Sequence, residues 1–155
     1  MIIKALATGV SHLLLPLTLL AGATSFVPSA IAQQTQQTRL YNPIPLPPSN
    51  QVSDTLSERD IPTGDGGFAR DYLVRFNQGD NIAIDLTSDH FDTIVTLMSP
   101  EGATLAENDD GPDGTTNSLL FTRINQTGNY IIRVRSFGET GGGAFVLRVT
   151  RLRPI

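Results

Sequence analysis

Residues 128–135 have the sequence Gly-Asn-Tyr-Ile-Ile-Arg-Val-Arg, and this stretch decides the fold class. Successive side chains of an extended strand point to opposite faces, so Tyr130, Ile132 and Val134 share one face. The other face carries two arginines, so one face is expected to be buried and the other solvated. Thr127-Gly128-Asn129, just before, predicts a tight turn that starts this strand.

The same alternation recurs from Arg70 onward in short runs separated by Gly, Asn and Asp. The alternating runs are residues 72–77, 82–87, 119–121, 130–135 and 145–150, and a further short strand is expected at 104–107. Residues 93–99 are more continuously apolar, as expected of a strand buried on both faces. Because no helical period appears, the sequence predicts an all-β fold. We expect an antiparallel, jelly-roll-like β-sandwich of about seven or eight strands.

The first part of the chain has the features of an export signal. Lys4 gives a short positive region, and residues 13–23 are apolar but too short to span a membrane. Ala30-Ile31-Ala32 has the small-x-small pattern that signal peptidase recognises. We therefore expect a signal peptide at residues 1–32 and export to the periplasm or the medium. An amphipathic first helix is the alternative.

Residues 33–53 are rich in Gln, Pro, Ser and Asn, which favours an extended, semi-rigid spacer. The domain itself is then expected at residues 54–155. The alternative is that the spacer supplies a first strand and irregular coil packed on the domain. Four side chains there are apolar enough to dock: Leu40, Tyr41, Ile44 and Leu46.

Composition excludes several kinds of chemistry. The chain has no cysteine, and residues 33–155 have no lysine, no tryptophan and a single histidine, His90. Disulfides, thiolate metal sites, Schiff bases and multi-histidine zinc sites are therefore excluded. Removal of residues 1–32 takes away Lys4, their one charged side chain, so the formal charge of −4 becomes −5. This acidic balance disfavours nucleic acid as a partner and is compatible with cation binding.

The richest polar cluster is the loop of residues 108–117. Crowded oxygen ligands are what Ca²⁺ requires, although the spacing does not match an EF-hand. The candidate calcium ligands are Asp92, Asn108, Asp109, Asp110 and Asp113. The alternative is a loop whose Asp and Asn side chains bond their own backbone, with Asp92 capping it.

Four arginines are predicted to point outward from their strands. They are Arg75, Arg133, Arg135 and Arg148. One interpretation is a sheet-face patch that binds an anionic polymer or a protein partner. The other is that they pair across strands with acids such as Asp85 and keep the face soluble.

A catalytic reading of Ser88, His90 and the neighbouring aspartates is weak. Adjacent strand residues point to opposite faces, and the Gly-x-Ser-x-Gly motif of a nucleophile elbow is absent from the sequence.

Several motifs in order resemble a known family. They are Arg70-Asp71-Tyr72-Leu73-Val74-Arg75-Phe76, Phe91-Asp92-Thr93, Leu105-Ala106-Glu107-Asn108-Asp109-Asp110 and Gly128-Asn129-Tyr130. Together they resemble the bacterial pre-peptidase C-terminal domain over about residues 54–152. The resemblance implies a jelly-roll-like sandwich that does not itself cleave peptide bonds and usually accompanies a secreted protease.

The sequence therefore predicts an exported, non-catalytic module that binds a protein or an extracellular or envelope polymer, and no membrane span after export. Two alternatives remain at this point: a small secreted hydrolase that uses carboxylates, and a structural envelope component that assembles through edge strands.

Overall fold

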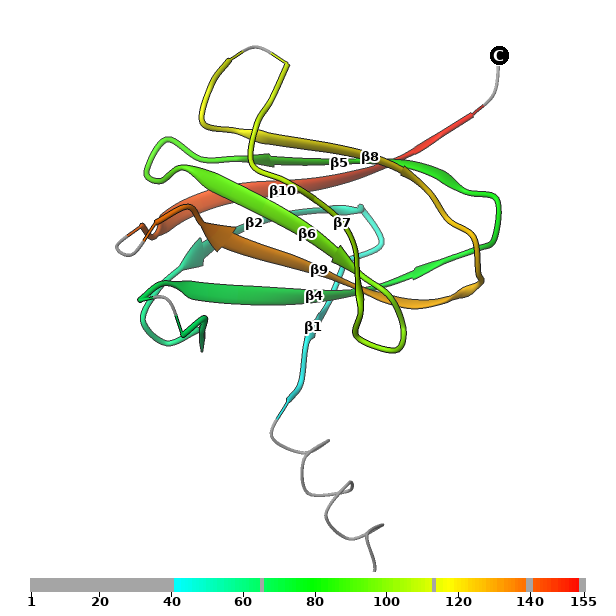
Figure 1. Cartoon of the computed structure of the whole chain (residues 1–155), viewed down its shortest axis with the longest axis horizontal. Coiled ribbons are helices and arrows are strands. Elements are labelled where there is room, and N and C mark those ends of the chain that lie inside the picture. Colours follow the sequence, from blue (N-terminus) through cyan, green and yellow to red (C-terminus); the bar gives the residue numbers. More distant parts are fainter. Residues whose placement is uncertain (1–40, 65, 113, 139–140, 154–155) are drawn as a thin grey trace, which may run out of the picture.

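The computed structural model describes residues 41–64, 66–112, 114–138 and 141–153, which form ten strands and no helix (Figure 1). The strands are β1 (Ile44–Pro45), β2 (Gln51–Leu56), β3 (Ile61–Pro62), β4 (Phe68–Phe76), β5 (Asn81–Thr87), β6 (Thr93–Met98), β7 (Thr104–Asn108), β8 (Ser118–Arg123), β9 (Gly128–Ser136) and β10 (Gly143–Leu152). The all-β prediction is confirmed. The strands that alternation did not predict, β1 to β3, all precede Arg70. This part of the chain contains no helix long and apolar enough to cross a membrane.

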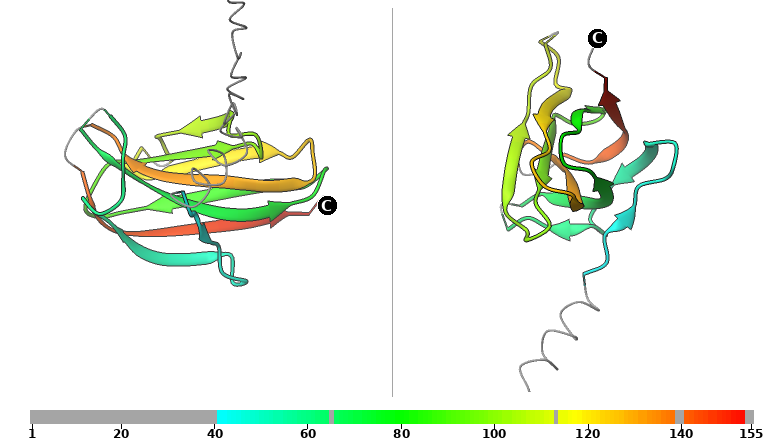
Figure 2. Two further views of the ribbon diagram at one scale, coloured as in Figure 1. Left: turned by 90° about the horizontal axis from the view of Figure 1, so that it is seen from below. Right: turned by 90° about the vertical axis from the view of Figure 1, so that its right-hand side faces the viewer.

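Two sheets pack face to face, as Figure 2 shows. Sheet A has the order β1-β4-β9-β6-β7, and β3 also pairs with β4; sheet B has the order β2-β10-β5-β8. The pairings are antiparallel except that between β1 and β4. From β4 onward the chain crosses repeatedly between the sheets, which confirms the jelly-roll-like sandwich.

The core lies between the sheets and is built from the inward face of each strand. Ile132 is fully buried at 0% exposure, and its neighbours Tyr130 and Val134 are buried beside it. The matching face of sheet B includes Ile82, Ile84, Leu86, Phe145, Leu147 and Val149. The burial pattern of β6 is continuous up to Met98, as predicted for a strand covered on both faces.

The turn before β9 shows why its sequence is Gly-Asn-Tyr. A Cβ atom on Gly128 would lie 2.6 Å from Pro100 Cγ, so the packing of the rigid Pro100 ring against this position requires glycine. The buried Tyr130 donates its hydroxyl to the carbonyl of Gln126 at 2.6 Å, which is the arrangement of a tyrosine corner. The motif therefore fixes the entry of the chain into the central strand of sheet A.

The sandwich begins before residue 54, the predicted boundary. Pro45 pairs with Leu73 of β4, and residues 51–53 already pair with β10. Extended proline-rich chain fits a sheet edge because proline needs no hydrogen-bond acceptor there. This part of the predicted spacer is therefore built into the domain, while residues 1–32 and 33–40 lie outside the described residues.

The free side of β4 is covered by two short strands with the same sequence, Ile-Pro. Strand β3 pairs with residues 68 and 69 of β4, and β1 pairs with residues 72 and 73 of the same strand. Proline on an edge blocks further pairing, which protects a long strand from joining another sheet. Between β1 and β3 the edge of β4 stays open at Arg70 and Asp71, and the candidate site lies there.

Candidate partner-binding site

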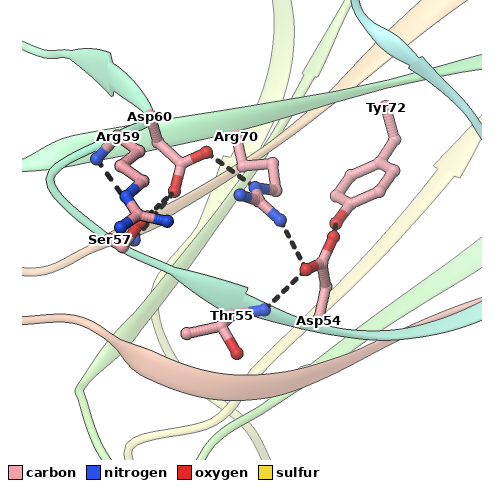
Figure 3. A network of polar contacts seen from close by, with 7 residues as sticks. All are labelled: Asp54, Thr55, Ser57, Arg59, Asp60, Arg70 and Tyr72. Atoms are coloured by element: carbon pink, nitrogen blue, oxygen red, sulfur yellow. Dashed lines mark hydrogen bonds and ion pairs between the residues drawn. The ribbon is translucent and has the colours of Figure 1, made fainter.

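Arg70 and Asp71 are adjacent on β4, so their side chains point to opposite faces of sheet A and build two separate networks. On the inner side, Arg70 forms ion pairs with Asp54 of β2 and, at 2.7 Å, with Asp60 (Figure 3). The Tyr72 hydroxyl donates to Asp54 at 2.8 Å. This Arg70 network joins β2 of sheet B to β4 of sheet A at the edge of the sandwich.

The electrostatics of the Arg70 network favour its charged form. Burial alone would raise the pKa of Asp54, but the Thr55 N–H, the Tyr72 hydroxyl and the Arg70 guanidinium together lower it. Burial would lower the pKa of Arg70, yet the two carboxylates raise it. Burial and the adjacent Asp54 carboxylate raise the pKa of Tyr72. Asp54 is therefore ionised and Tyr72 neutral at ordinary pH.

On the outer side, the buried Asp71 carboxylate is held by a planar fork. Arg133 Nε and one terminal nitrogen donate to its two oxygens, both at 2.8 Å. Tyr41 also donates its hydroxyl to Asp71. Burial and this hydrogen bond raise the pKa of Tyr41 to about 12. The Asp71 network thus ties the segment that carries β1 to the centre of sheet A.

The Asp71 network continues as a polar row across sheet A. Asp71, Arg133, Thr96 and Glu107 stand opposite one another on β4, β9, β6 and β7. Thr96 donates its hydroxyl to Glu107 at 2.6 Å, and Arg135 lies 3.0 Å from the same carboxylate. The hydrogen bond from Thr96, with help from Arg135, lowers the pKa of Glu107. The row is therefore ordered by contacts within the domain itself.

Two shallow hollows flank β3 above this row, and we call them together the groove. A hollow of about 300 Å³ lies between β1 and β3, with walls that include Tyr41, Ile44, Arg59 and Ile61. A second, of about 250 Å³, lies on the other side of β3 and reaches Met98. Both include Ile61 in their walls, so β3 forms a ridge between them.

The rim of the first hollow is apolar and carries one uncompensated charge. Tyr41, Ile44 and Ile61 are 43%, 41% and 37% exposed, and they are three of the seven exposed large hydrophobic side chains in the described ranges. The Arg59 side chain forms no ion pair or hydrogen bond with any described residue. The groove therefore offers exposed apolar surface beside a guanidinium that no carboxylate neutralises.

Comparison with known proteins gives a match for the segment that contributes Arg70, Asp71 and Arg133 to the two networks. Residues 70–136 match the family model described as the bacterial pre-peptidase C-terminal domain. The match extends from Arg70 of β4 to the end of β9, and the predicted resemblance is confirmed.

Two solved structures share the fold of this domain. One is the pre-peptidase C-terminal domain of a collagenase from Bacillus anthracis, with 13% identity and a TM-score of 0.52 over 70% of this chain and 93% of that chain. The other is Aeromonas hydrophila PliG, a periplasmic lysozyme inhibitor of g-type lysozyme, with 13% identity and a TM-score of 0.53 over 72% and 96%. At such identity the likeness shows the fold alone. The search of curated proteins finds no match.

The motifs that predicted the family have structural roles in the domain. Thr93 is fully buried, and its N–H and hydroxyl both contact the Thr116 carbonyl, at 2.9 and 3.0 Å. Its hydroxyl also lies 2.7 Å from that of Ser118. Asn108 donates from its amide to the Leu119 carbonyl at 2.8 Å. These side chains hold the β7–β8 loop against the sandwich.

The predicted arginine patch is divided between the two sheets. Arg75, Arg133 and Arg135 lie on the outer face of sheet A, where Arg133 and Arg135 are paired as described above. Arg148 lies on the outer face of sheet B, opposite Asp85 in register, and its Nε donates to Gln51 at 3.0 Å. The four do not form one surface, and their binding role stays a prediction.

The predicted calcium loop is held by its own amides where it is described. Asn108 Oδ1 accepts the Asp110 N–H at 3.0 Å, and Asn117 Oδ1 accepts the Ser88 N–H at 2.9 Å. Among described residues no three carboxylates or histidines lie close enough to hold a metal. Asp113 lies outside the described residues. The Asp92 backbone carbonyl accepts the Phe137 N–H, and calcium binding stays a prediction.

The residues around His90 do not form a catalytic arrangement. The buried Ser88 hydroxyl donates to the Ala144 carbonyl at 2.8 Å and accepts the backbone N–H groups of His90 and Phe91. Hollows of about 420 and 510 Å³ flank this turn. The Ser88 hydroxyl therefore caps the loop, and among the described residues it forms no hydrogen bond with the His90 imidazole.

Sequence reasoning missed the groove because its partners are far apart in the chain. Asp54 is 18 residues from Tyr72, and Asp71 is 62 residues from Arg133. The one available signal was Arg70-Asp71 at the start of an otherwise apolar strand. Charged neighbours on a buried strand require partners on both sides of the sheet.

Proposed function

We propose that the protein is an exported, non-catalytic accessory domain that binds a protein partner through the groove. The observation that carries this proposal is the exposed apolar rim of Tyr41, Ile44 and Ile61 beside Arg59. Tyrosine and arginine are enriched among the side chains that contribute most to protein interfaces, and grouped apolar side chains mark interaction sites. The family match and the two similar folds support an accessory role.

The two ion-pair networks prepare the groove for binding. The Asp71 network fixes the segment around β1, and the Arg70 network fixes the loop around Asp60, which leads into β3. Both walls of the first hollow are therefore tied to the same strand, β4. A preorganised surface loses less conformational entropy on association than a mobile one, which favours affinity.

The alternative of a hydrolase that uses carboxylates receives less support. A general acid needs a raised pKa, whereas the pKa values of Asp54 and Glu107 are both lowered by their partners. Asp60 and Asp71 are in ion pairs with arginines. Assembly through edge strands is disfavoured at β4 because the two Ile-Pro strands cover it.

Affinity capture from envelope extracts tests the proposal if groove variants are compared with a matched control. Ile61→Asp places a charge on the ridge of the groove, and Leu105→Asp places the same charge at an exposed leucine on β7. We expect the unmodified protein and the Leu105 variant to capture the same partner, and Ile61→Asp and Arg59→Glu to lose it. Equal capture by all four proteins would reject the groove as the binding site.

Export is part of the proposal and has its own test. We propose cleavage after Ala32, because Ala30-Ile31-Ala32 follows the apolar stretch. Amino-terminal sequencing of protein recovered from the producing cells should give Gln33. Protein that starts at Met1 and stays in the cytoplasm would contradict export while leaving the groove untouched.

A further inference from the structure

The outer face of sheet B, on the side of the sandwich opposite the groove, has two exposed apolar side chains near one end. Phe121 of β8 is 62% exposed and Leu152 of β10 is 43% exposed. Thr150, Ala83 and Phe121 stand opposite one another in register on three adjacent strands. Leu152, Asn81 and Arg123 form the next row towards the end of the sheet. The aromatic and the aliphatic side chain therefore lie in adjacent rows of a flat surface.

Positive charge accompanies these apolar side chains. Arg123 and Arg153 are exposed, and their side chains have no ion-pair or hydrogen-bond partner among residues 41–64, 66–112, 114–138 and 141–153. Arg148 is one row farther along the face and bonds only the neutral Gln51. Asp85 is the one acidic residue that the strand pairing places on this face. The face is locally cationic although the whole chain has a formal charge of −4.

The hollow at this end is wide and shallow. Its volume is about 450 Å³, and its walls include Phe121, Leu152, Asn81 and Arg153. Phenylalanine and leucine flanked by arginines have the composition of surfaces that lie in a membrane interface, where the apolar groups enter the acyl boundary and the guanidiniums contact phosphates. A protein surface that matched this face would need acidic groups spaced around two protruding apolar groups, whereas an anionic bilayer supplies both features everywhere.

We propose that this face, defined by Phe121, Leu152, Arg123 and Arg153, docks the domain on the surface of an anionic phospholipid bilayer. The domain lies on the bilayer without spanning it. Since the groove is on the other sheet, it stays open to a protein partner while the domain is docked. The two proposals are independent, and either can fail without the other.

Sedimentation with vesicles tests the docking. The segment 33–155 contains every described strand and the whole core, and it lacks the apolar residues 1–32, which would bind lipid by themselves. We expect it to sediment with vesicles of phosphatidylcholine mixed with phosphatidylglycerol and to bind phosphatidylcholine alone at least about tenfold more weakly, since each arginine near an anionic surface strengthens binding about fivefold. High salt should reduce the binding because it screens these charges. Equal binding to both vesicles, or none to either, would overturn the proposal.

Matched variants locate the docking face. Phe121→Ser should weaken binding about tenfold, since burial of a phenylalanine is worth at least that factor, while Phe137→Ser, at a side chain 57% exposed elsewhere, should not. The pair Arg123→Gln and Arg153→Gln should weaken binding about tenfold or more, and Arg75→Gln on sheet A should leave most of it. All these positions are exposed, so a thermal midpoint confirms folding for each variant. Equal losses for test and control variants would reject this face.

Discussion

Aspartates at the β4 edge are paired with arginines, whereas those in the β5–β6 and β7–β8 loops are not. At the β4 edge, Asp54, Asp60 and Asp71 each contact an arginine. In the loops around residues 88–92 and 108–112, the described aspartates form no ion pair with any described residue. Buried and partly buried carboxylates need partners, whereas those on a solvated loop do not. The densest run of acidic residues in the sequence is therefore a solvated loop, and the ordered ion pairs lie at the β4 edge instead.

Substitution of Asp71 should cause the largest loss of stability and so gives the strongest test of the difference between the edge and the loops. Asp71→Ala leaves the partly buried Arg133 without its carboxylate, so we expect a loss of about 2 to 4 kcal/mol, at the lower part of the range for broken buried pairs because Arg133 is partly exposed. Asp109→Ala in the loop should change stability by less than about 0.5 kcal/mol. Urea unfolding measures both. Similar losses at the two positions would show that the edge and the loop do not differ.

A smaller effect is expected from the hydroxyl that joins the two sheets. Tyr72→Phe removes the hydrogen bond to the charged Asp54 and should cost about 1 to 2 kcal/mol. A double-mutant cycle with Asp54→Asn checks the cause, because the cost of Tyr72→Phe should fall in that background. An unchanged cost would mean that packing of the ring, rather than the network, accounts for the loss.

Acid should destabilise the domain through the carboxylates whose pKa values are lowered in the folded state. The pKa values of Asp54 and Glu107 are lowered from ordinary values of 3.8 and 4.5 in the folded protein. A lowered folded pKa contributes stability that is present above the ordinary value and is lost as pH falls through the folded pKa. The thermal midpoint should therefore fall below about pH 4 to 5, and less steeply in the variant Asp54→Asn. An identical pH profile for that variant would argue against the network.

The smallest effect concerns calcium and the loop. If the side-chain amides of Asn108 and Asn117 alone hold the loop in its conformation, exchange of a chelator for millimolar Ca²⁺ should leave the thermal midpoint unchanged. Asn108→Ala should then lower the free energy of unfolding by about 1 kcal/mol, because its hydrogen bonds are lost. A rise of several degrees with Ca²⁺, abolished by Asp109→Asn with Asp110→Asn, would instead support the predicted calcium site. A rise of about 4 to 8 °C corresponds to about 1 kcal/mol in a domain of this size.

The sequence by itself determined the strands from β4 onward and the inward face of most of them. Tyr130, Ile132 and Val134 are buried as predicted because the alternation of side chains along a strand is a local property. The same rule identified β4, β5, β8 and β10, a continuous apolar run identified β6, and the family motifs identified the fold. Strands β1 and β3 carry no such signal, since a two-residue strand with proline has no alternation to recognise.

Only the tertiary structure decided which charges meet and which surfaces stay open. Arg133 points outward, as predicted. Its partner Asp71 is 62 residues away in the sequence, and Tyr41 donates a hydrogen bond to the same carboxylate. Phe121 lies on an apolar run, yet Ser118 and Leu120 turn inward and leave it exposed. Strand register depends on pairing between distant segments, so local pattern alone does not fix it. The groove and the cationic face both follow from that register.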